Sequence, residues 1–333
     1  ITHTISLLGH RESNEDQHEI FENLNNENEN ENENKKYKNI NLYAIFDGHG
    51  GKDVSKYLKD NMATYFTSNY MKFNINNTTE FKKYIEKVFD HLQIKLERRF
   101  KNFSYNIGST ALLLIIYKIK NNTHFYVANV GDCRAVICKK NNLGIQLTKD
   151  HKPHIFDEKE RIEKLGGEIY YDGYDWRIGD LSVSKAFGDM DASPFVTHKP
   201  EIFKYNIKKS DKFIILACDG LWDVITNEEA IYFVLNSASL MIGGEIFIPK
   251  LPSYDILQLT RVIEPEAEVK IIGLRPGEKI HEQMIGLEDA PHTYAYEDHF
   301  KILPMIHNWS ADPMRIKNGT KVPENFTYTS DNN

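Results

Sequence analysis

The 333-residue chain has the composition of a folded globular protein. Hydrophobic residues make up 41% and charged residues 27%, so enough apolar material is present to build a core. Acidic residues number 48 against 41 Lys and Arg, and the resulting net charge of −7 argues against nucleic-acid binding. No apolar run approaches the roughly 20 residues of a membrane-spanning helix, so no membrane span is expected.

The cysteine content indicates a reducing compartment. Cys133, Cys138 and Cys218 are an odd number and contain no Cys-x-x-Cys pair. Neither a disulfide framework nor a zinc site is therefore expected. Because no targeting segment is visible, the cytoplasm or the nucleus is the expected location.

The first hundred residues predict an insertion, a strand and two helices. Residues 23–36 are an Asn- and Glu-rich run with nothing apolar to bury, so we expect a mobile surface loop. The pattern INLYAIF predicts a strand that leads into Asp47 and a glycine-rich turn. Apolar residues at helical spacing predict helices over 52–70 and 79–100.

The middle of the chain predicts short strands and further helices. The strands are ALLLIIYKI, THFYVANV and CRAVICK, and we expect the last two to form a hairpin with Gly131 and Asp132 at its turn. DEKERIEKL predicts a helix that ends at the Gly-Gly pair 166–167. KFIILACDG predicts a buried strand, followed by a helix from about Thr226. Strands grouped between paired helices favour an α+β fold over alternating βαβ units.

Acidic residues that follow strands suggest a cation site. Asp47 and Asp219 each end an apolar run and are each followed by glycine, which lets a ligand approach the backbone closely. Carboxylates that converge at a sheet edge suit Mg²⁺ or Mn²⁺, which prefer oxygen ligands. A water bound by two such ions becomes a nucleophile that can attack phosphorus. The run RESNED adds Arg11, a fork-shaped phosphate binder, together with Glu15 and Asp16.

Eight motifs in order make residues 1 to about 235 resemble the metal-dependent protein serine/threonine phosphatases of type 2C. They are RESNED, FDGHGG, GSTALL, VANVGDCRAV, LTKDHKP, RIEKLGGEI, LSVSKAFGD and ACDGLWDV. The resemblance implies a central sandwich of two antiparallel sheets flanked by helix pairs. It also implies a two-metal site at one end and phosphorylated proteins as substrates.

The resemblance implies a metal-ligand set. Asp47 would bridge two Mg²⁺ or Mn²⁺ ions, the Gly48 carbonyl would bind one of them, and Asp219 would bind the other. Asp132 and Asp223 match positions that hold a third, weaker ion in relatives.

The resemblance also implies substrate-facing roles. Arg11 would hold the substrate phosphate, and Glu15 and Asp16 would orient metal-bound waters. His49 would be the general acid that protonates the leaving serine or threonine oxygen. We interpret LSVSKAFGD and RIEKLGGEI as structural motifs that position neighbouring segments.

The last hundred residues resemble a different family. Composition shifts from about residue 240, and we place a domain boundary between 223 and 242. Residues 236–333 resemble the carboxy-terminal end of UDP-N-acetylglucosamine 4,6-dehydratase-type enzymes, of the extended short-chain dehydrogenase family. The matching segments are MIGGEIFIPKLPS, KIIGLRPGEKIHEQMI, the Glu-Asp pair at 297–298 and FTYTSDNN. In that family Arg275 would contact the nucleotide phosphates.

Dehydratase activity is not expected from this segment. No glycine-rich G-x-G-x-x-G turn exists to hold a dinucleotide, and the Tyr-x-x-x-Lys spacing at Tyr205 and Lys209 is interpreted as coincidence. We therefore expect residues 236–333 to form a small, separate α/β segment, a substrate lobe without its cofactor domain.

The sequence thus predicts a hybrid of a phosphatase-like part and a dehydratase-like segment. The phosphatase sandwich is expected to be incomplete at its C-terminal end. The late Ser-x-Asp-Asn segment of relatives, which supplies another metal ligand, is missing, and Asp331 is not assigned that role. Loss of a carboxylate weakens a metal cluster, so we expect reduced or absent turnover. The alternatives are a non-catalytic phosphoprotein-binding module and a fragment of a UDP-sugar dehydratase. The oligomeric state and the natural substrate stay open.

Overall fold

The computed structural model divides the chain into two compact units. One unit is formed by residues 15–231, and the other by residues 1–14 with 232–333. The structure describes residues 2–4, 6, 13–22, 24, 40–67, 75, 77–99, 106–119, 122–250, 256–265, 268–269, 283–304 and 313–329. Residues 25–36 of the predicted polar insertion lie outside this described part.

The larger unit contains most of the secondary structure, and one helix, α5, extends beyond it. Its strands are β1 (Gln17–Phe21), β2 (Ile40–Phe46), β3 (Gly48–His49), β4 (Gly108–Ser109), β5 (Ala111–Ile119), β6 (Asn122–Val130), β7 (Arg134–Lys139), β8 (Gly144–Gln146), β9 (Tyr170–Tyr171), β10 (Trp176–Arg177), β11 (Phe187–Gly188), β12 (Glu201–Asn206) and β13 (Asp211–Ala217). Its helices are α1 (Asp53–Met62), η2 (Ala63–Phe66), α2 (Thr78–Arg99), α3 (Phe156–Lys164), η3 (Met190–Ala192), α4 (Asp219–Trp222) and α5 (Asn227–Leu240).

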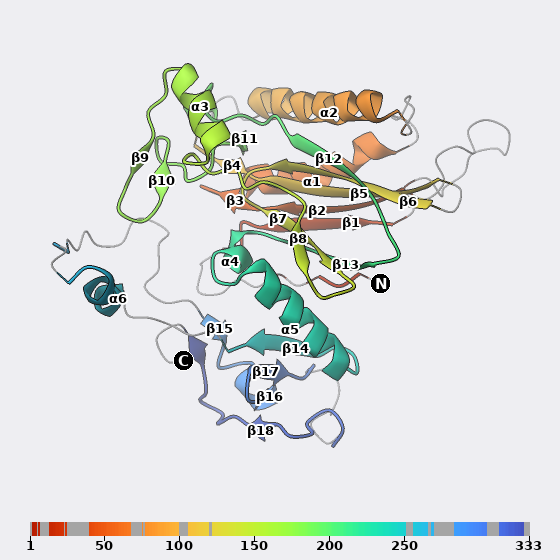
Figure 1. Cartoon of the computed structure of the whole chain (residues 1–333), viewed down its shortest axis with the longest axis vertical. Helices are drawn as coiled ribbons and strands as arrows, with labels where there is room; N and C mark the ends of the chain where they lie inside the picture. The colour runs from red at the N-terminus through yellow and green to blue at the C-terminus, as the bar shows by residue number, and fades with distance from the viewer. Residues whose placement is uncertain are drawn as a thin grey trace. The chain divides into compact units, whose positions relative to one another are not determined.

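Two antiparallel sheets form the centre of this unit. The larger sheet has the order β1-β2-β5-β6-β12, and the smaller has the order β13-β7-β8. Helices α1 and α2 cover one face of the larger sheet, and the smaller sheet lies on its other face (Figure 1). The predicted α+β class with an antiparallel sandwich is confirmed.

The central strand β5 shows why the larger sheet is buried on both faces. Leu113 and Ile115 pack in one hydrophobic core with Phe89 of α2. Their neighbours Leu112 and Leu114 point the other way, into the core shared with the smaller sheet. Successive side chains of a strand alternate between faces, so a strand covered on both sides is apolar throughout.

The double-sided core gives a test by small truncation. Ile115→Val removes one methylene from a side chain that is 0% exposed, and it should lower the free energy of unfolding by about 1 kcal/mol. Ile145→Val makes the same change at a side chain that is 40% exposed and should have little effect. Urea unfolding curves of the two variants would measure both. Equal losses would contradict this placement of β5.

The two long predicted helices are present with small differences at their ends. The first ends at Met62 and tightens into η2, whereas a helix to residue 70 was expected. Residues 68–70 lie outside the described residues. The second spans Thr78–Arg99, and its predicted apolar stripe is buried throughout.

The predicted hairpin between THFYVANV and CRAVICK is wrong. Strand β6 pairs with β5 and β12, whereas β7 pairs with β8 and β13 in the other sheet. Gly131 and Asp132 therefore carry the chain from one sheet to the other. Gly131 has φ +102°, a conformation that suits glycine, and an added Cβ would lie 2.5 Å from Thr110.

Strand β13 is less buried than predicted. Its residues are mostly half-buried because β13 is an edge strand of the smaller sheet and pairs on one side with β7. Helix α3 agrees with its prediction and ends before Gly166, which has φ +84°. Asp219 begins the short helix α4, which the sequence pattern did not predict.

The smaller unit contains short antiparallel strands. Its elements are β14 (Ile246–Pro249), α6 (Ile256–Ile263), β15 (Gln283–Ile285), η4 (Ala290–His292), β16 (Thr293–Ala295), β17 (His299–Ile302), β18 (Thr320–Lys321) and β19 (Tyr328–Thr329). The sheets have the orders β14-β17-β16-β18 and β15-β19. Ile248, Ile285, Phe300 and Tyr328 build its hydrophobic core. Among the described residues, no helix is long and apolar enough to cross a membrane.

Candidate metal centre

The two carboxylates predicted as metal ligands meet at one end of the sandwich. Asp47 lies between β2 and β3 of the larger unit, and Asp219 begins α4 directly after β13 and Cys218. The side chains of Asp47, Cys218 and Asp219 each offer a ligand atom, and all three atoms lie within 4.8 Å of one another. Because β2 and β13 belong to different sheets, the sandwich itself brings these residues together.

The backbone of Asp47 is fixed by its neighbour on β5. The Asp47 amide donates to Thr110 Oγ1 at 3.0 Å, and the Thr110 amide donates to the Asp47 carbonyl at 2.9 Å. Thr110 Oγ1 also contacts the buried thiol of Cys133 at 3.1 Å. These contacts use the backbone of Asp47 and leave its carboxylate to interact with Asp16 and Asp219.

Crowding of like charges perturbs these carboxylates. Burial first, and then the charges of Asp219, Asp16 and Asp132, raise the pKa of Asp47 well above its ordinary value. Burial and the charges of Asp132 and Asp223 raise the pKa of Asp219 to about 6. The cluster therefore holds more negative charge than its protein surroundings balance.

Lys152 is the ammonium that faces part of this cluster. Its Nζ lies 3.0 Å from Asp132 Oδ2 and 3.7 Å from Asp175 Oδ2. Burial alone would lower the pKa of Lys152, but Asp132 and Asp223 raise it above its ordinary value. Burial also raises the pKa of Asp223, and the positive charge of Lys152 partly offsets this rise. Asp132 and Asp223, the predicted ligands of a third ion, therefore both interact with the charge of Lys152.

Gly48 allows a close approach between two segments. A Cβ at this position would lie 2.5 Å from the Glu15 carbonyl oxygen and 2.9 Å from Ser55 Oγ. Ser55 of α1 donates its hydroxyl proton to that same Glu15 carbonyl at 2.5 Å. The contact places Glu15 and Asp16 beside the cluster, and the Cys218 thiol donates to Asp16 Oδ2 at 3.5 Å.

His49 makes a short contact that the sequence pattern did not predict. Its Nε2 lies 2.8 Å from Asp189 Oδ2, and Asp189 is the last residue of LSVSKAFGD. Burial alone would lower the pKa of His49, but the hydrogen bond and the charge of Asp189 raise it above its ordinary value.

The structure therefore gathers most of the predicted site residues in one place. Asp16, Asp47, Asp132, Asp219 and Asp223 influence one another electrostatically. Arg11 and Asp331 lie outside the described residues, as does Arg275 of the C-terminal segment. Sequence reasoning missed the parts played by Lys152, Asp189 and Cys218, although each lies inside a motif that was recognised.

The donor set fits hard divalent cations. Carboxylate oxygens dominate it, and Mg²⁺ and Mn²⁺ prefer such ligands. The raised pKa values of Asp47 and Asp219 point the same way, because a divalent cation would supply the positive charge that the pair lacks.

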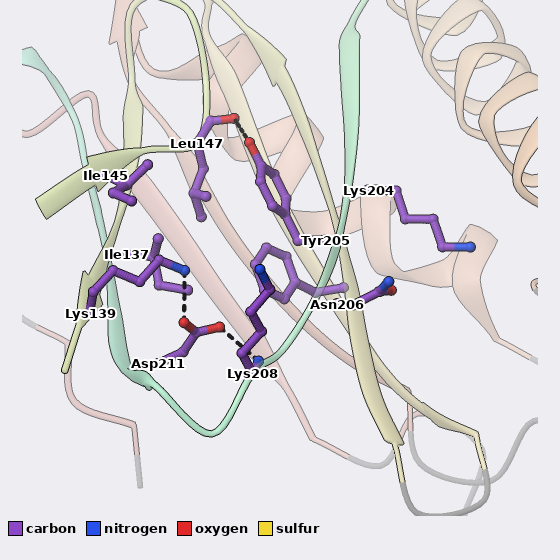
Figure 2. Close-up of a pocket in the computed structure, with 10 residues that line it drawn as sticks. Ile137, Lys139, Ile145, Leu147, Lys204, Tyr205, Asn206, Lys208 and Asp211 are labelled. Atoms are coloured by element: carbon purple, nitrogen blue, oxygen red, sulfur yellow. Dashed lines mark hydrogen bonds and ion pairs between the residues drawn. The ribbon is translucent and has the colours of Figure 1, made fainter.

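Cavities elsewhere in the larger unit have a different character. A cavity of about 360 Å³ between the two sheets is lined by Phe125, Ile137, Leu147 and Tyr205, the last three of which are labelled in Figure 2. Its carboxylate, Asp211, is neutralised by Lys139 at 2.7 Å. A second cavity of about 560 Å³ lies beside Gly188 and Met190. Neither gathers several carboxylates, so the acidic end of the sandwich is the better candidate for chemistry.

Two family models match the chain. The family model described as Protein phosphatase 2C matches residues 5–250. A second family model, described as Polysaccharide biosynthesis protein, matches residues 201–304.

Similar curated proteins are phosphatase-like. A PP2C-like domain-containing protein R307 of Acanthamoeba polyphaga mimivirus is 56% identical over 114 residues, which cover 32% of this chain and 63% of the relative. Probable protein phosphatase 2C 45 of Oryza sativa subsp. japonica is 41% identical over 194 residues, covering 58% of this chain and 64% of the relative. The chain spans less than two thirds of the length of either relative.

Solved structures agree at the level of the fold. A C. elegans sex determining protein superposes with a TM-score of 0.59 at 25% identity, covering 69% of this chain and 54% of that one. The serine-threonine phosphatase 2C from Toxoplasma gondii gives a TM-score of 0.57 at 20% identity, covering 70% of this chain and 81% of that one.

Proposed function

Because the chain belongs to the protein phosphatase 2C family, we propose that it hydrolyses phosphoserine and phosphothreonine in proteins, with Mg²⁺ or Mn²⁺ bound at the acidic end of its sandwich. The observation that carries this proposal is the convergence of Asp47 and Asp219 from different sheets. Their raised pKa values indicate a site that lacks positive charge.

The proposed ligands are residues of the two sheet ends. Asp47 would be shared by two ions, with the Gly48 carbonyl on one and Asp219 on the other. When bound, such ions supply a water acidic enough to attack phosphorus in line. Glu15 and Asp16 would orient that water by hydrogen bonds. Asp132 and Asp223 are the proposed ligands of a third ion. Lys152 balances part of their negative charge when that ion is not bound.

Two further side chains would act on the substrate. Arg11 would pair its forked guanidinium with the phosphate oxygens. His49 would donate a proton to the leaving serine or threonine oxygen as the bond to phosphorus breaks. Its ring is 28% exposed, so a bound substrate can reach it.

Hydrolysis of a phosphothreonine peptide by the full chain, with Mn²⁺ or with EDTA, tests this proposal. We expect turnover with Mn²⁺ and none with EDTA. Turnover that persists in EDTA would contradict the metal mechanism. Tight peptide binding by folded protein without turnover would instead identify a non-catalytic phosphoprotein-binding module.

For residues 236–333 we propose relationship to the end of UDP-N-acetylglucosamine 4,6-dehydratase-type enzymes, without their activity. The support is the second family match together with the motifs of this segment. The Tyr205 hydroxyl donates to the Leu147 carbonyl at 3.1 Å and so has a structural partner. Titration calorimetry with NADP⁺ should detect no binding, and incubation with UDP-N-acetylglucosamine should leave the sugar nucleotide unchanged. Formation of a dehydrated sugar nucleotide would contradict the proposal.

A further inference from the structure

The buried carboxylate of Asp189 is held against the ring of His49. The Nε2–Oδ2 distance is 2.8 Å, and the Asp189 side chain is 0% exposed. Its other oxygen, Oδ1, is also buried and makes no hydrogen bond to any described residue. We propose that Asp189 is a positioning residue that fixes the His49 ring through Nε2 and leaves Nδ1 to face the leaving oxygen. The proposal rests on the function proposed above.

The backbone of Asp189 supports a fixed orientation. Asp189 has φ 43° and ψ 50°, in the left-handed region that few residues other than glycine adopt. Its amide donates to the Ile107 carbonyl at 3.1 Å, and its carbonyl accepts from Ala192 at 3.0 Å. A strained residue held on both sides persists where the surroundings determine its conformation, and such residues concentrate at functional sites.

Gly108 is a second, independent observation. Strands β3, β4 and β11 pair so that His49 and Gly188 both lie opposite Gly108. A Cβ at Gly108 would lie 2.1 Å from Asp189 Oδ2 and 2.3 Å from His49 Nε2. The imidazole and the carboxylate therefore meet in the space that any side chain at this position would fill.

This arrangement accounts for the bonds, the electron pair and the proton in the proposed hydrolysis. Water attacks phosphorus, the bond from phosphorus to the serine or threonine oxygen breaks, and its electron pair goes to that oxygen. The oxygen takes the proton from Nδ1 of the doubly protonated ring. The ring is left neutral with its proton on Nε2, which it still donates to Asp189.

Asp189→Asn is the main test because asparagine has the same size and tolerates the left-handed backbone. The neutral amide is a weaker acceptor for the Nε2 proton than a carboxylate, so it holds the ring less firmly. We expect kcat on a phosphothreonine peptide to fall by about 10- to 100-fold with KM little changed. Hydrolysis of p-nitrophenyl phosphate, whose leaving group needs no proton, should change less than about threefold. Equal losses on both substrates would overturn the proposal.

The matched control is Asp191→Asn, an exposed carboxylate two residues further along in η3, which should leave both rates unchanged. In a His49→Gln background, Asp189→Asn should add less than about a twofold loss, because the two residues act as one unit. Independent, multiplying losses would overturn the positioning role. Gly108→Ala should separate the His49 ring from the Asp189 carboxylate. It should therefore also slow hydrolysis of the phosphothreonine peptide more than hydrolysis of p-nitrophenyl phosphate.

A ring measurement separates this proposal from the proposed function. Nitrogen-15 NMR of the histidine rings, with the His49 signal identified by its loss in His49→Gln, reports which nitrogen carries the proton. We expect Nε2 protonation in the native chain and a different ring pattern in Asp189→Asn. Absent hydrolysis by the native chain would contradict the function alone. Identical ring signals in the two proteins would overturn the positioning of His49 by Asp189.

Discussion

Replacement of Asp47 by asparagine should abolish metal-dependent hydrolysis, with a loss of at least about 10³-fold. The proposed ion pair supplies several kcal/mol of transition-state stabilisation, and each 1.36 kcal/mol is worth roughly a factor of ten. Asparagine removes the charge at the ligand that both ions would share. The contacts of the Asp47 backbone with Thr110 do not involve the side chain, so they remain in the variant. Initial rates with Mn²⁺ on a phosphothreonine peptide measure the effect.

The same substitution should stabilise the metal-free protein. Asp47 is buried beside Asp219, Asp16 and Asp132, and a neutral amide removes that repulsion. We therefore expect Asp47→Asn to unfold at a higher temperature than the native chain in EDTA, and to gain less from added Mn²⁺. Asp180→Asn, at an exposed position, is the control and should change neither quantity. A variant that keeps a tenth of native activity would contradict the role of Asp47.

Local patterns predicted those parts of the fold that local chemistry determines. The apolar stripes of α1 and α2 and the acidic residues after β2 and β13 are visible at helical or strand spacing, and they lie as expected. The partner of each strand is not local information. Gly131 and Asp132 look like a hairpin turn, but β5 presents apolar side chains on both faces. A second sheet is needed to bury the face that α1 and α2 do not cover.

The candidate site shows the same division. Asp47 and Asp219 could be assigned because their motifs are specific, whereas the contact of His49 with Asp189 joins residues 140 positions apart. No spacing rule predicts such a contact, since it depends on how β3, β4 and β11 pair. Lys152 was hidden for a similar reason: a lysine in a polar motif is usually solvated, and only the fold places it beside Asp132.

The stability of the metal-free protein should fall as the pH rises from about 4 to about 7. Burial and neighbouring charges raise the pKa of Asp219 to about 6, against an ordinary value of 3.8. Between these values the folded state binds more protons than the unfolded state, so raising the pH favours unfolding. The pKa values of Asp47 and Asp223 are raised by burial too, and they act with the same sign. For Asp219 alone the change is about 2 kcal/mol.

Urea unfolding in EDTA at several pH values measures this dependence, and Asp219→Asn should flatten it. Glu158 acts with the opposite sign: burial alone would raise its pKa, but Lys185 and Arg161 hold it below its ordinary value. Its stabilisation is therefore lost as the pH falls below its ordinary value of 4.5, so it opposes Asp219 only at the acidic edge of the window. Because Mg²⁺ or Mn²⁺ binds the ionised carboxylates, saturating metal should reverse the slope. A metal-free protein that becomes more stable as the pH rises toward 7 would contradict a charge-deficient site, and with it the physical reason for placing the ions there.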